Sequence, residues 1–213
     1  MTDLTLWGAT TSRTMRAHWA MHELGLRYRC VPIRSRSGET QTGVFTAINP
    51  RQKIPALVDG DVVITESAAI ISYLSGLYGT PDNGLVPIGA RERARYDEWA
   101  YFILTELDAT SLYVVRRHLG LPDIYGAAPV AVDAAFAYFQ RQIATVAATL
   151  DDGRSWLMGE RFTGADMLLT TCLTWATRLE QPLADSLIRF RDRATARPAY
   201  QAAAAANEPA YWV

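Results

Sequence analysis

Residues 49–74 read NPRQKIPALVDGDVVITESAAIISYL, and this stretch decides the fold of the first part of the chain. Pro55 stands directly before the apolar run 56–58, where its missing N–H suits the start of a strand, and the bond that precedes it can be cis. An Asp-Gly turn leads to a second short run, 62–64, which is expected to return antiparallel. The following residues carry apolar side chains at helical spacing as far as Leu77. The stretch therefore predicts strand, turn, strand and helix.

Several groups in this stretch suit a peptide ligand. Ile54 can offer its N–H and C=O to an extended peptide, as one more strand would. Lys53, the only lysine of the chain, supplies a cation for a carboxylate. Glu66 and Ser67 stand at a helix N-terminus, where free N–H groups favour a carboxylate and Glu66 can pair with an amine. Singly, these residues also fit ordinary turn and cap chemistry. Together they predict a peptide-binding corner.

The order of these features resembles that of a known family. Proline, strand, Asp-Gly turn, strand and Glu-Ser helix match the second half of a thioredoxin-like fold, and the pattern resembles the glutathione-binding motif of the glutathione transferase family. Upstream, residues 4–7 and 28–33 have strand patterns, and residues 15–24 have a helical one. The segment SRTMRAHWAMHELGLRYRCVPI is similar to the first helix and second strand of bacterial members. Together the two resemblances cover about residues 3–78.

In that family a hydroxyl or thiol of the first strand-to-helix loop contacts the glutathione sulfur. Here the catalytic candidates are Ser12, Thr11 and Thr10, and the loop contains no cysteine or tyrosine. A donated hydrogen bond and a helix N-terminus favour the thiolate, and each unit of pKa lowering corresponds to about 1.4 kcal/mol. Counting back from the helix end favours Thr11 or Ser12, whereas counting forward from the strand places Ala9 or Thr10 at the active position. Each hydroxyl also fits a plain helix cap.

The resemblance implies roles for the glutathione-binding residues. Ile54 is expected to hold the peptide backbone, and Lys53 the glycyl carboxylate. Glu66 and Ser67 are expected to hold the γ-glutamyl end. Arg13 lies in the first turn of the first helix, where a cation opposes the dipole and is better tolerated beside an anionic ligand. The expected set is Arg13, Lys53, Ile54, Pro55, Glu66 and Ser67.

A segment rich in glycine, proline and asparagine, residues 80–90, separates this part of the chain from two long helical patterns. These patterns cover about residues 91–119 and 130–150. The predicted organisation is an α/β thioredoxin-like domain at residues 1–79, a linker, and an all-α helical-bundle domain at residues 91–213.

A capping pattern supports the helical second half. Thr163 and Asp166 stand three residues apart, as in a capping box, before apolar residues at helical spacing. The segment resembles the aromatic-Thr-x-Ala-Asp folding motif of the family's second domain, so Asp166 is expected to be structural. In relatives the helices after the linker wall the second-substrate pocket, although aromatic residues on a helix also fit the core. The residues expected there are Tyr101, Leu104, Asp108, Ser111 and Tyr113.

The composition is typical of a soluble globular protein, with 49% hydrophobic and 20% charged residues. A net charge of -1 argues against a nucleic-acid partner, because phosphate binding needs concentrated positive charge. Cys30 and Cys172 lie far apart in the sequence, and the pair His18 and His22 lacks a third ligand, so no metal site is expected. No apolar run approaches the roughly 18 residues of a membrane helix. A cytoplasmic protein without a membrane partner is predicted.

These observations predict a glutathione transferase that joins the glutathione thiolate to a small hydrophobic electrophile, with glutathione as co-substrate. A homodimer is implied by the resemblance. Two alternatives keep the same fold. One is a glutathione-dependent peroxidase or isomerase. The other is a non-catalytic glutathione-binding or ligand-binding protein.

Overall fold

The computed structural model describes residues 4–208, which form two compact units. Of the described residues, the first unit combines 4–87 with 195–208, and the second comprises 88–194. The N-terminal unit therefore contains two segments that are far apart in the sequence.

The first unit contains a four-stranded mixed sheet. Its strands are β1 (Leu4–Trp7), β2 (Arg29–Val31), β3 (Ala56–Asp59) and β4 (Val62–Thr65). Their order is β2-β1-β3-β4, with β1 and β2 parallel and the other two pairs antiparallel. The strand-turn-strand predicted after Pro55 is confirmed, since β3 and β4 pair with Leu57 opposite Ile64. A mixed sheet with this order is the expected thioredoxin-like arrangement.

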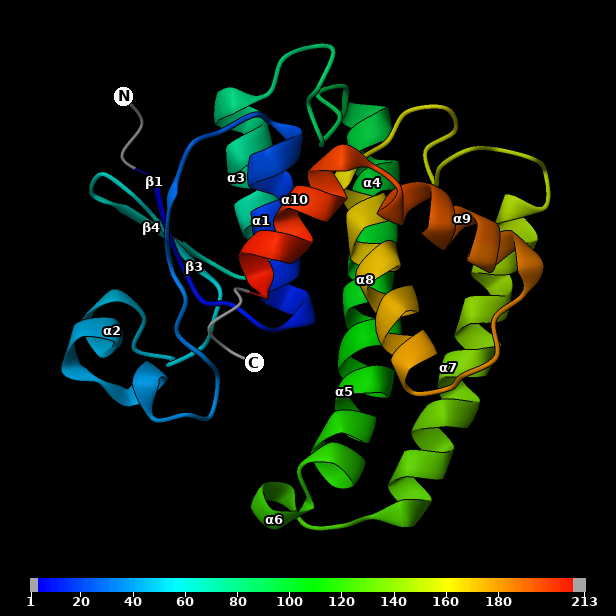
Figure 1. The fold of residues 1–213 in the computed structure, drawn as a ribbon. Coiled ribbons are helices and arrows are strands. Elements are labelled where there is room, and N and C mark those ends of the chain that lie inside the picture. Colours follow the sequence, from blue (N-terminus) through cyan, green and yellow to red (C-terminus); the bar gives the residue numbers. More distant parts are fainter. Residues whose placement is uncertain (1–3, 209–213) are drawn as a thin grey trace. The chain divides into compact units, whose positions relative to one another are not determined.

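Four helices complete this unit: α1 (Ser12–Glu23), α2 (Gly43–Ile48), α3 (Ser67–Tyr78) and α10 (Pro198–Asn207), with a 3-10 turn at Glu39–Gln41. Helix α1 packs against both α3 and α10, and Figure 1 shows these three together on one side of the strands. Helix α2 buries Phe45 against Ile54 and Ala56. The sheet is thus covered by helices that include α10, the last helix of the described residues.

The second unit consists of helices, as predicted. Its elements are α4 (Ala90–Phe102), a π-helical segment (Ile103–Leu112), α5 (Tyr113–Val115), a second π-helical segment (Arg116–Gly120), α6 (Pro122–Tyr125), α7 (Pro129–Leu150), α8 (Gly164–Arg178) and α9 (Asp185–Thr195). The two long helical patterns predicted from the sequence each bury apolar or aromatic side chains, among them Tyr96, Ile103, Phe139 and Val146. In Figure 1 the segment from α4 to α5 runs beside α7 in the opposite direction.

The first long helix differs from the regular helix that the sequence predicts. From Ile103 the hydrogen bonds change from α to π geometry, and Tyr113 N–H donates to the Asp108 carbonyl five residues earlier. The Ser111 hydroxyl donates to the carbonyl of Glu106, also five residues earlier. π geometry widens a helix locally and occurs often at functional sites. Apolar spacing alone does not distinguish it from an α-helix.

The compact units do not coincide with the predicted domain boundaries, because α10 clusters with the first unit although it lies within the segment 91–213. The division at residues 1–79, 80–90 and 91–213 therefore stays a prediction about domains. Among residues 4–208, no helix combines the length and the apolar content needed to cross a membrane.

Candidate functional site

Sheet pairing brings the predicted glutathione-binding corner together at one edge of the first unit. Trp7 lies opposite Ala56, and Ala56 lies opposite Thr65 on the next strand. The residues just beyond this row are therefore neighbours at the same edge: Gly8 after β1, Pro55 before β3 and Glu66 after β4. Three segments of the sequence meet there, as a ligand-binding edge requires.

A glycine allows the loop after β1 to lie directly against the corner. Gly8 has φ +113°, a conformation that L side chains rarely adopt. A Cβ atom on Gly8 would lie 2.6 Å from Ile54 Cβ and 2.9 Å from Thr14 Cγ2. Only a glycine fits this approach, and it places the loop with the three candidate hydroxyls next to Ile54.

The backbone around Ile54 leaves hydrogen-bonding groups available. The Ile54–Pro55 bond is cis, one of the two geometries that the sequence allowed. Within residues 4–208, the N–H and C=O of Ile54 have no hydrogen-bond partner. Asn49 fixes the preceding residue, because its Nδ2 donates to the Lys53 carbonyl at 2.7 Å and its Oδ1 accepts from Arg51 N–H. Lys53 itself is exposed. An extended peptide can use this backbone as it would use a strand edge.

Glu66 and Ser67 lie at the start of α3, as predicted. Glu66 has φ +68°, an unusual conformation for a residue with a side chain, and its carboxylate lies 3.8 Å from Arg51 Nη1. Ser67 is buried, yet its hydroxyl has no hydrogen-bond partner within the described residues. Strained backbone of this kind is often found at ligand sites. The carboxylate and the hydroxyl suit an amino-acid head group.

The three candidate hydroxyls have different surroundings. Thr11 is the N-cap of α1, since its Oγ1 accepts from Thr14 N–H at 3.0 Å while Thr14 Oγ1 accepts from Thr11 N–H at 3.0 Å. Thr10 is exposed and has φ +66°. Ser12 is the first residue of α1, is half-buried, and its hydroxyl has no partner among residues 4–208. Among residues 4–208 the hydroxyls of both Ser12 and Thr10 lack a partner, but Ser12 lies in the first turn of α1, beside helix N–H groups that favour an anion. Arg13 follows in the same turn and is half-buried.

A buried histidine that no sequence pattern indicated as a site residue supports this loop. His18 is fully buried; its Nε2 lies 3.2 Å from the Gly8 carbonyl and its Nδ1 2.7 Å from the Tyr28 hydroxyl. A carbonyl can only accept, so Nε2 carries the proton and Nδ1 accepts from Tyr28. Burial lowers the pKa of His18 to about 4. The ring is therefore neutral near pH 7 and holds the Gly8 peptide in place.

The residues predicted for the second-substrate pocket belong to the other unit. Tyr101 is exposed, Leu104 is half-buried, and Asp108 is buried in the π-helical segment. Ser111 is also buried, with its hydroxyl donated to Glu106, and Tyr113 lies under the guanidinium of Arg117. Four of these five positions lie in or beside the π-helical segment, and their role stays a prediction.

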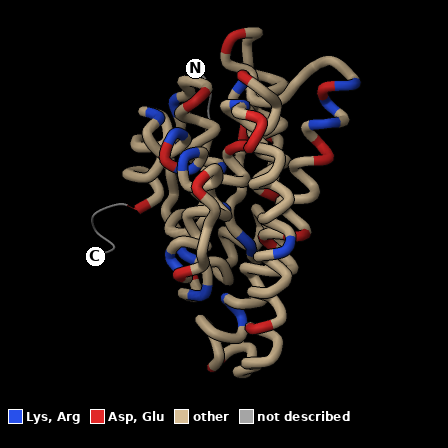
Figure 2. Tube along the Cα trace, turned by 90° about the vertical axis from the view of Figure 1, so that its right-hand side faces the viewer, with Lys and Arg blue, Asp and Glu red and all other residues tan. Residues whose placement is uncertain are grey.

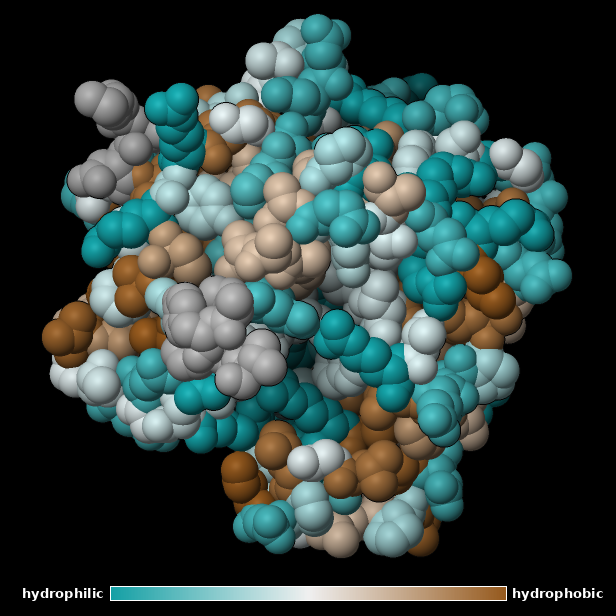
Figure 3. Space-filling model, in the orientation of Figure 1, coloured by the Kyte–Doolittle hydropathy of each residue, from teal (hydrophilic) through white to brown (hydrophobic). Residues whose placement is uncertain are grey.

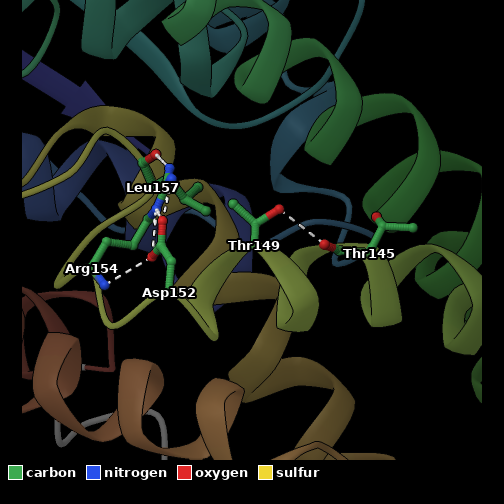
Figure 4. Close-up of polar contacts among 5 residues, drawn as sticks. All are labelled: Thr145, Thr149, Asp152, Arg154 and Leu157. Atoms are coloured by element: carbon green, nitrogen blue, oxygen red, sulfur yellow. Dashed lines mark hydrogen bonds and ion pairs between the residues drawn. The ribbon is translucent and has the colours of Figure 1, made fainter.

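The helical unit contains a cavity of about 820 Å³ that includes none of these five residues. Its walls come from α4, the end of α7 and the loop that follows α7: Arg95, Glu98, Trp99, Phe102, Thr145, Asp152, Arg154, Leu157, Met158 and Gly159. Figure 4 shows why the loop wall is fixed, since Arg154 pairs with Asp152 and donates to the Leu157 carbonyl. The lining has two cations and two carboxylates and so carries no net formal charge.

Charged and apolar residues have different distributions over the surface. Figure 2 shows acidic and basic residues interspersed along the chain. Figure 3 shows hydrophobic side chains gathered over α6 and the neighbouring helix ends, where Leu119, Ile124 and Val130 are exposed. Within residues 4–208, no group of three or more His, Cys, Asp or Glu side chains is placed to hold a metal ion.

Comparisons with known proteins agree with this geometry. The family description "Glutathione S-transferase, N-terminal domain" matches residues 2–76, and "Glutathione S-transferase, C-terminal domain" matches residues 102–198. The chain is 29% identical to glutathione S-transferase GstA of Escherichia coli O157:H7, over 91% of this chain and 94% of that protein. It is 30% identical to glutathione S-transferase 3 of Zea mays, over 78% of this chain and 75% of that protein.

Among solved structures, the chain is similar to a theta class glutathione S-transferase from Xanthomonas axonopodis pv. citri that was crystallised with glutathione bound. The two are 27% identical with a TM-score of 0.81, over 94% of this chain and 96% of that one. The likeness spans both units.

Proposed function

The chain belongs to the glutathione S-transferase family, and from this premise we propose that it transfers the glutathione thiolate to a small hydrophobic electrophile. One observation carries the proposal. The unpaired backbone of Ile54 and the uncommitted hydroxyl of Ser12 belong to segments that Gly8 brings into contact. A tripeptide held along Ile54 would then extend its central thiol toward the start of α1.

The proposed glutathione pose uses each feature of the corner. The cysteinyl unit pairs with the N–H and C=O of Ile54, and the glycyl carboxylate lies near Lys53 with Pro55 shaping the turn. The γ-glutamyl end occupies the start of α3, where the Glu66 carboxylate pairs with its ammonium and Ser67 with its carboxylate. Arg13 adds positive charge near the sulfur.

The chemistry requires a thiolate, because the thiol itself is a weak nucleophile. Ser12 Oγ donates a hydrogen bond to the sulfur, and the N-terminus of α1 adds a favourable field, so the thiol proton leaves to solvent at a lower pH. The sulfur lone pair forms a bond to the electrophilic carbon while the leaving group departs with its electron pair. Thr10 and Thr11 are the secondary candidates for the hydroxyl role.

Titration of the bound thiol tests this proposal. We expect the ultraviolet absorbance of the thiolate to appear, in the complex, at least one unit below the free cysteine pKa of about 8.5. Ser12→Ala is expected to return the pKa of the bound thiol toward that value and to lower kcat about tenfold or more. Binding with an unshifted thiol pKa would contradict thiolate activation and favour a binding protein.

A second experiment tests the binding corner. Glu66→Gly removes the carboxylate and also relieves the positive φ, so we expect at least about tenfold weaker glutathione binding with no loss of thermal stability. Glu180→Gly is the matched control, because Glu180 also has a positive φ, of +55°, but lies in the helical unit. Equal glutathione affinity in the two variants would contradict the pocket assignment. Ser67→Ala is expected to weaken binding as well.

Product analysis separates the possible reactions. A thioether product supports transfer, whereas oxidised glutathione with a reduced peroxide, or a rearranged substrate with glutathione unchanged, would assign a peroxidase or an isomerase. The proposal also includes a cytoplasmic homodimer, for which the family is the support. Sedimentation at micromolar concentration measures the oligomeric state directly.

A further inference from the structure

The last helix of the described residues contacts the loop that carries the three candidate hydroxyls, Thr10, Thr11 and Ser12, which we call the hydroxyl loop. Helix α10 lies beside α1 within the first unit (Figure 1). Asn207, the last residue of α10, is 4% exposed. Asn207 Oδ1 lies 2.7 Å from Thr14 Oγ1, and Asn207 Nδ2 lies 3.4 Å from the Thr11 carbonyl. The main-chain carbonyl of Asn207 accepts from Thr10 N–H at 2.8 Å. One residue thus contacts three positions of a loop that lies almost two hundred residues earlier.

The orientation of the Asn207 amide follows from its neighbours. With Nδ2 toward the Thr11 carbonyl, every contact pairs a donor with an acceptor. The flipped amide would place Oδ1 against that carbonyl oxygen, so that two acceptors would face each other. Oδ1 therefore faces Thr14, and this buried oxygen needs a donated proton.

The Thr14 hydroxyl is the donor to Asn207 Oδ1. This assignment determines which hydroxyl donates in the contact between Thr11 and Thr14. Thr14 Oγ1 has one proton, which can go to Asn207 Oδ1 at 2.7 Å or to the Thr11 carbonyl at 2.9 Å. The Thr11 carbonyl already accepts from Met15 N–H at 2.9 Å and from Asn207 Nδ2. Asn207 Oδ1 has no other donor among the described residues, so the proton goes there.

Thr11 then has no proton left for a ligand. Its Oγ1 accepts from Thr14 N–H and lies 3.0 Å from Thr14 Oγ1. Because the Thr14 proton points to Asn207, the proton in this contact comes from Thr11. The chain of donation runs from Thr11 to Thr14 to Asn207. Ser12, which has no partner within residues 4–208, keeps a proton that it can donate.

We propose that Asn207 is a positioning residue for the hydroxyl loop: its side chain directs the Thr11 proton into the helix cap and its backbone holds Thr10, which leaves Ser12 as the donor to the sulfur. This inference rests on the proposed function and deepens it. It also explains why Thr11, one of three adjacent hydroxyls, is not the donor to the sulfur.

The experiment uses the full chain and titrates the thiol of bound glutathione. Asn207→Leu keeps the branching and the number of side-chain heavy atoms, and the backbone contact, but removes both amide contacts. Without these contacts the first turn of α1 is no longer held to α10, so Ser12 loses its fixed position relative to the sulfur. We therefore expect the pKa of the bound thiol to rise by about one unit, a tenfold loss of thiolate below that pKa. We expect the KM for glutathione to change less than about threefold, because the contacts at Ile54 and Glu66 are untouched. The matched control is Gln201→Leu, which removes an amide on α10 whose one hydrogen bond within residues 4–208 is to the Thr195 carbonyl.

Thr14 supplies a second test that does not depend on how Asn207→Leu folds. Thr14→Val removes the relaying hydroxyl and is expected to raise the thiol pKa as Asn207→Leu does, whereas Thr14→Ser retains it. The double variant Asn207→Leu/Thr14→Val should equal either single variant, because both break one chain. Lower thermal stability with an unchanged thiol pKa in both single variants overturns the inference while the proposed function stands. A wild-type protein that binds no glutathione overturns both.

Discussion

At the scale of single residues, the candidate site depends on one glycine. A side chain at Gly8 would meet Ile54 Cβ at 2.6 Å in a backbone conformation that L residues avoid. We therefore expect Gly8→Ala to lower the free energy of unfolding by about 3 kcal/mol or more and to abolish glutathione binding. Gly25→Ala is the control, since Gly25 has φ +65° but nothing within 4 Å of an added Cβ. It should cost only about 1–2 kcal/mol in chemical denaturation. Equal losses in the two variants would exclude the close contact as the cause.

His18 predicts a pH dependence of stability. Burial lowers its pKa from 6.5 to about 4, so between these values the unfolded chain binds more protons than the folded one. The stabilisation from neutral His18 is complete above about pH 6.5 and is lost as the pH falls toward 4, by up to about 3 kcal/mol. His18→Asn should remove this contribution, which urea titrations at several pH values show as a pH-dependent difference from the wild type, and His118→Asn should retain it. A difference between His18→Asn and the wild type that stays constant from pH 6.5 to 4 would assign the contribution to another group.

How much of the site the sequence predicts depends on distance along the chain. Lys53, Ile54 and Glu66 lie in one local motif whose strand, turn and helix each have a sequence signal, so their common edge could be predicted. The choice among Thr10, Thr11 and Ser12 could not, because counting along the sequence does not show which hydroxyl proton is already donated. That depends on Asn207, which no pattern near the loop indicates.

At the scale of elements, a buried acid, Asp166, stabilises the start of α8. Asp166 is fully buried and accepts from Leu157 N–H at 2.8 Å, from Thr163 N–H at 2.6 Å and from the Thr163 hydroxyl at 2.8 Å. The predicted capping box is confirmed. Burial raises the pKa of Asp166 to about 6, against the opposing effect of these hydrogen bonds.

The pKa shift of Asp166 is opposite in sign to the pKa shift of His18. The folded state holds the Asp166 proton more tightly than the unfolded state, so its contribution is complete below about pH 4 and declines until about pH 6, by about 3 kcal/mol. Asp166→Asn should remove this decline, which denaturation at graded pH measures. The control Asp185→Asn changes an exposed acid in the first turn of α9 and should leave the slope in place. Glutathione affinity should be unchanged in both, because the role of Asp166 is structural.

The π-helical segments show where element prediction stops. The helical pattern over residues 91–119 predicts one buried face, on which Tyr96, Ile103 and Leu107 lie, because π and α geometry differ little over one turn. The change of geometry at Ile103 depends on which carbonyl each N–H and hydroxyl donates to, as the Ser111 hydroxyl donates to the Glu106 carbonyl. That selection follows from packing around the helix, which one sequence does not specify.

At the scale of the whole molecule, the first unit is discontinuous, and this has a consequence for its folding. Helix α10 supplies Tyr200, whose ring meets the buried Trp19 edge-on at 4.9 Å. Just before α10, Arg197 forms two hydrogen bonds with the Glu23 carboxylate, at 2.6 and 2.7 Å. A fragment that ends at residue 87 would expose the Trp19 ring and leave Glu23 without its cation.

We therefore expect the fragment 1–87 to lack a cooperative thermal transition by circular dichroism, although it contains the whole sheet. Joining residues 195–213 to it through a flexible Gly/Ser linker should restore the transition, because those residues return Tyr200 and Arg197 to α1. In the joined fragment, Arg197→Lys should lower the free energy of unfolding by about 1–2 kcal/mol, since lysine keeps the charge but not the paired geometry. Equal cooperativity with and without residues 195–213 would show that the sheet and α1 need no support from the chain's end. The site would then depend on α10 only through Asn207.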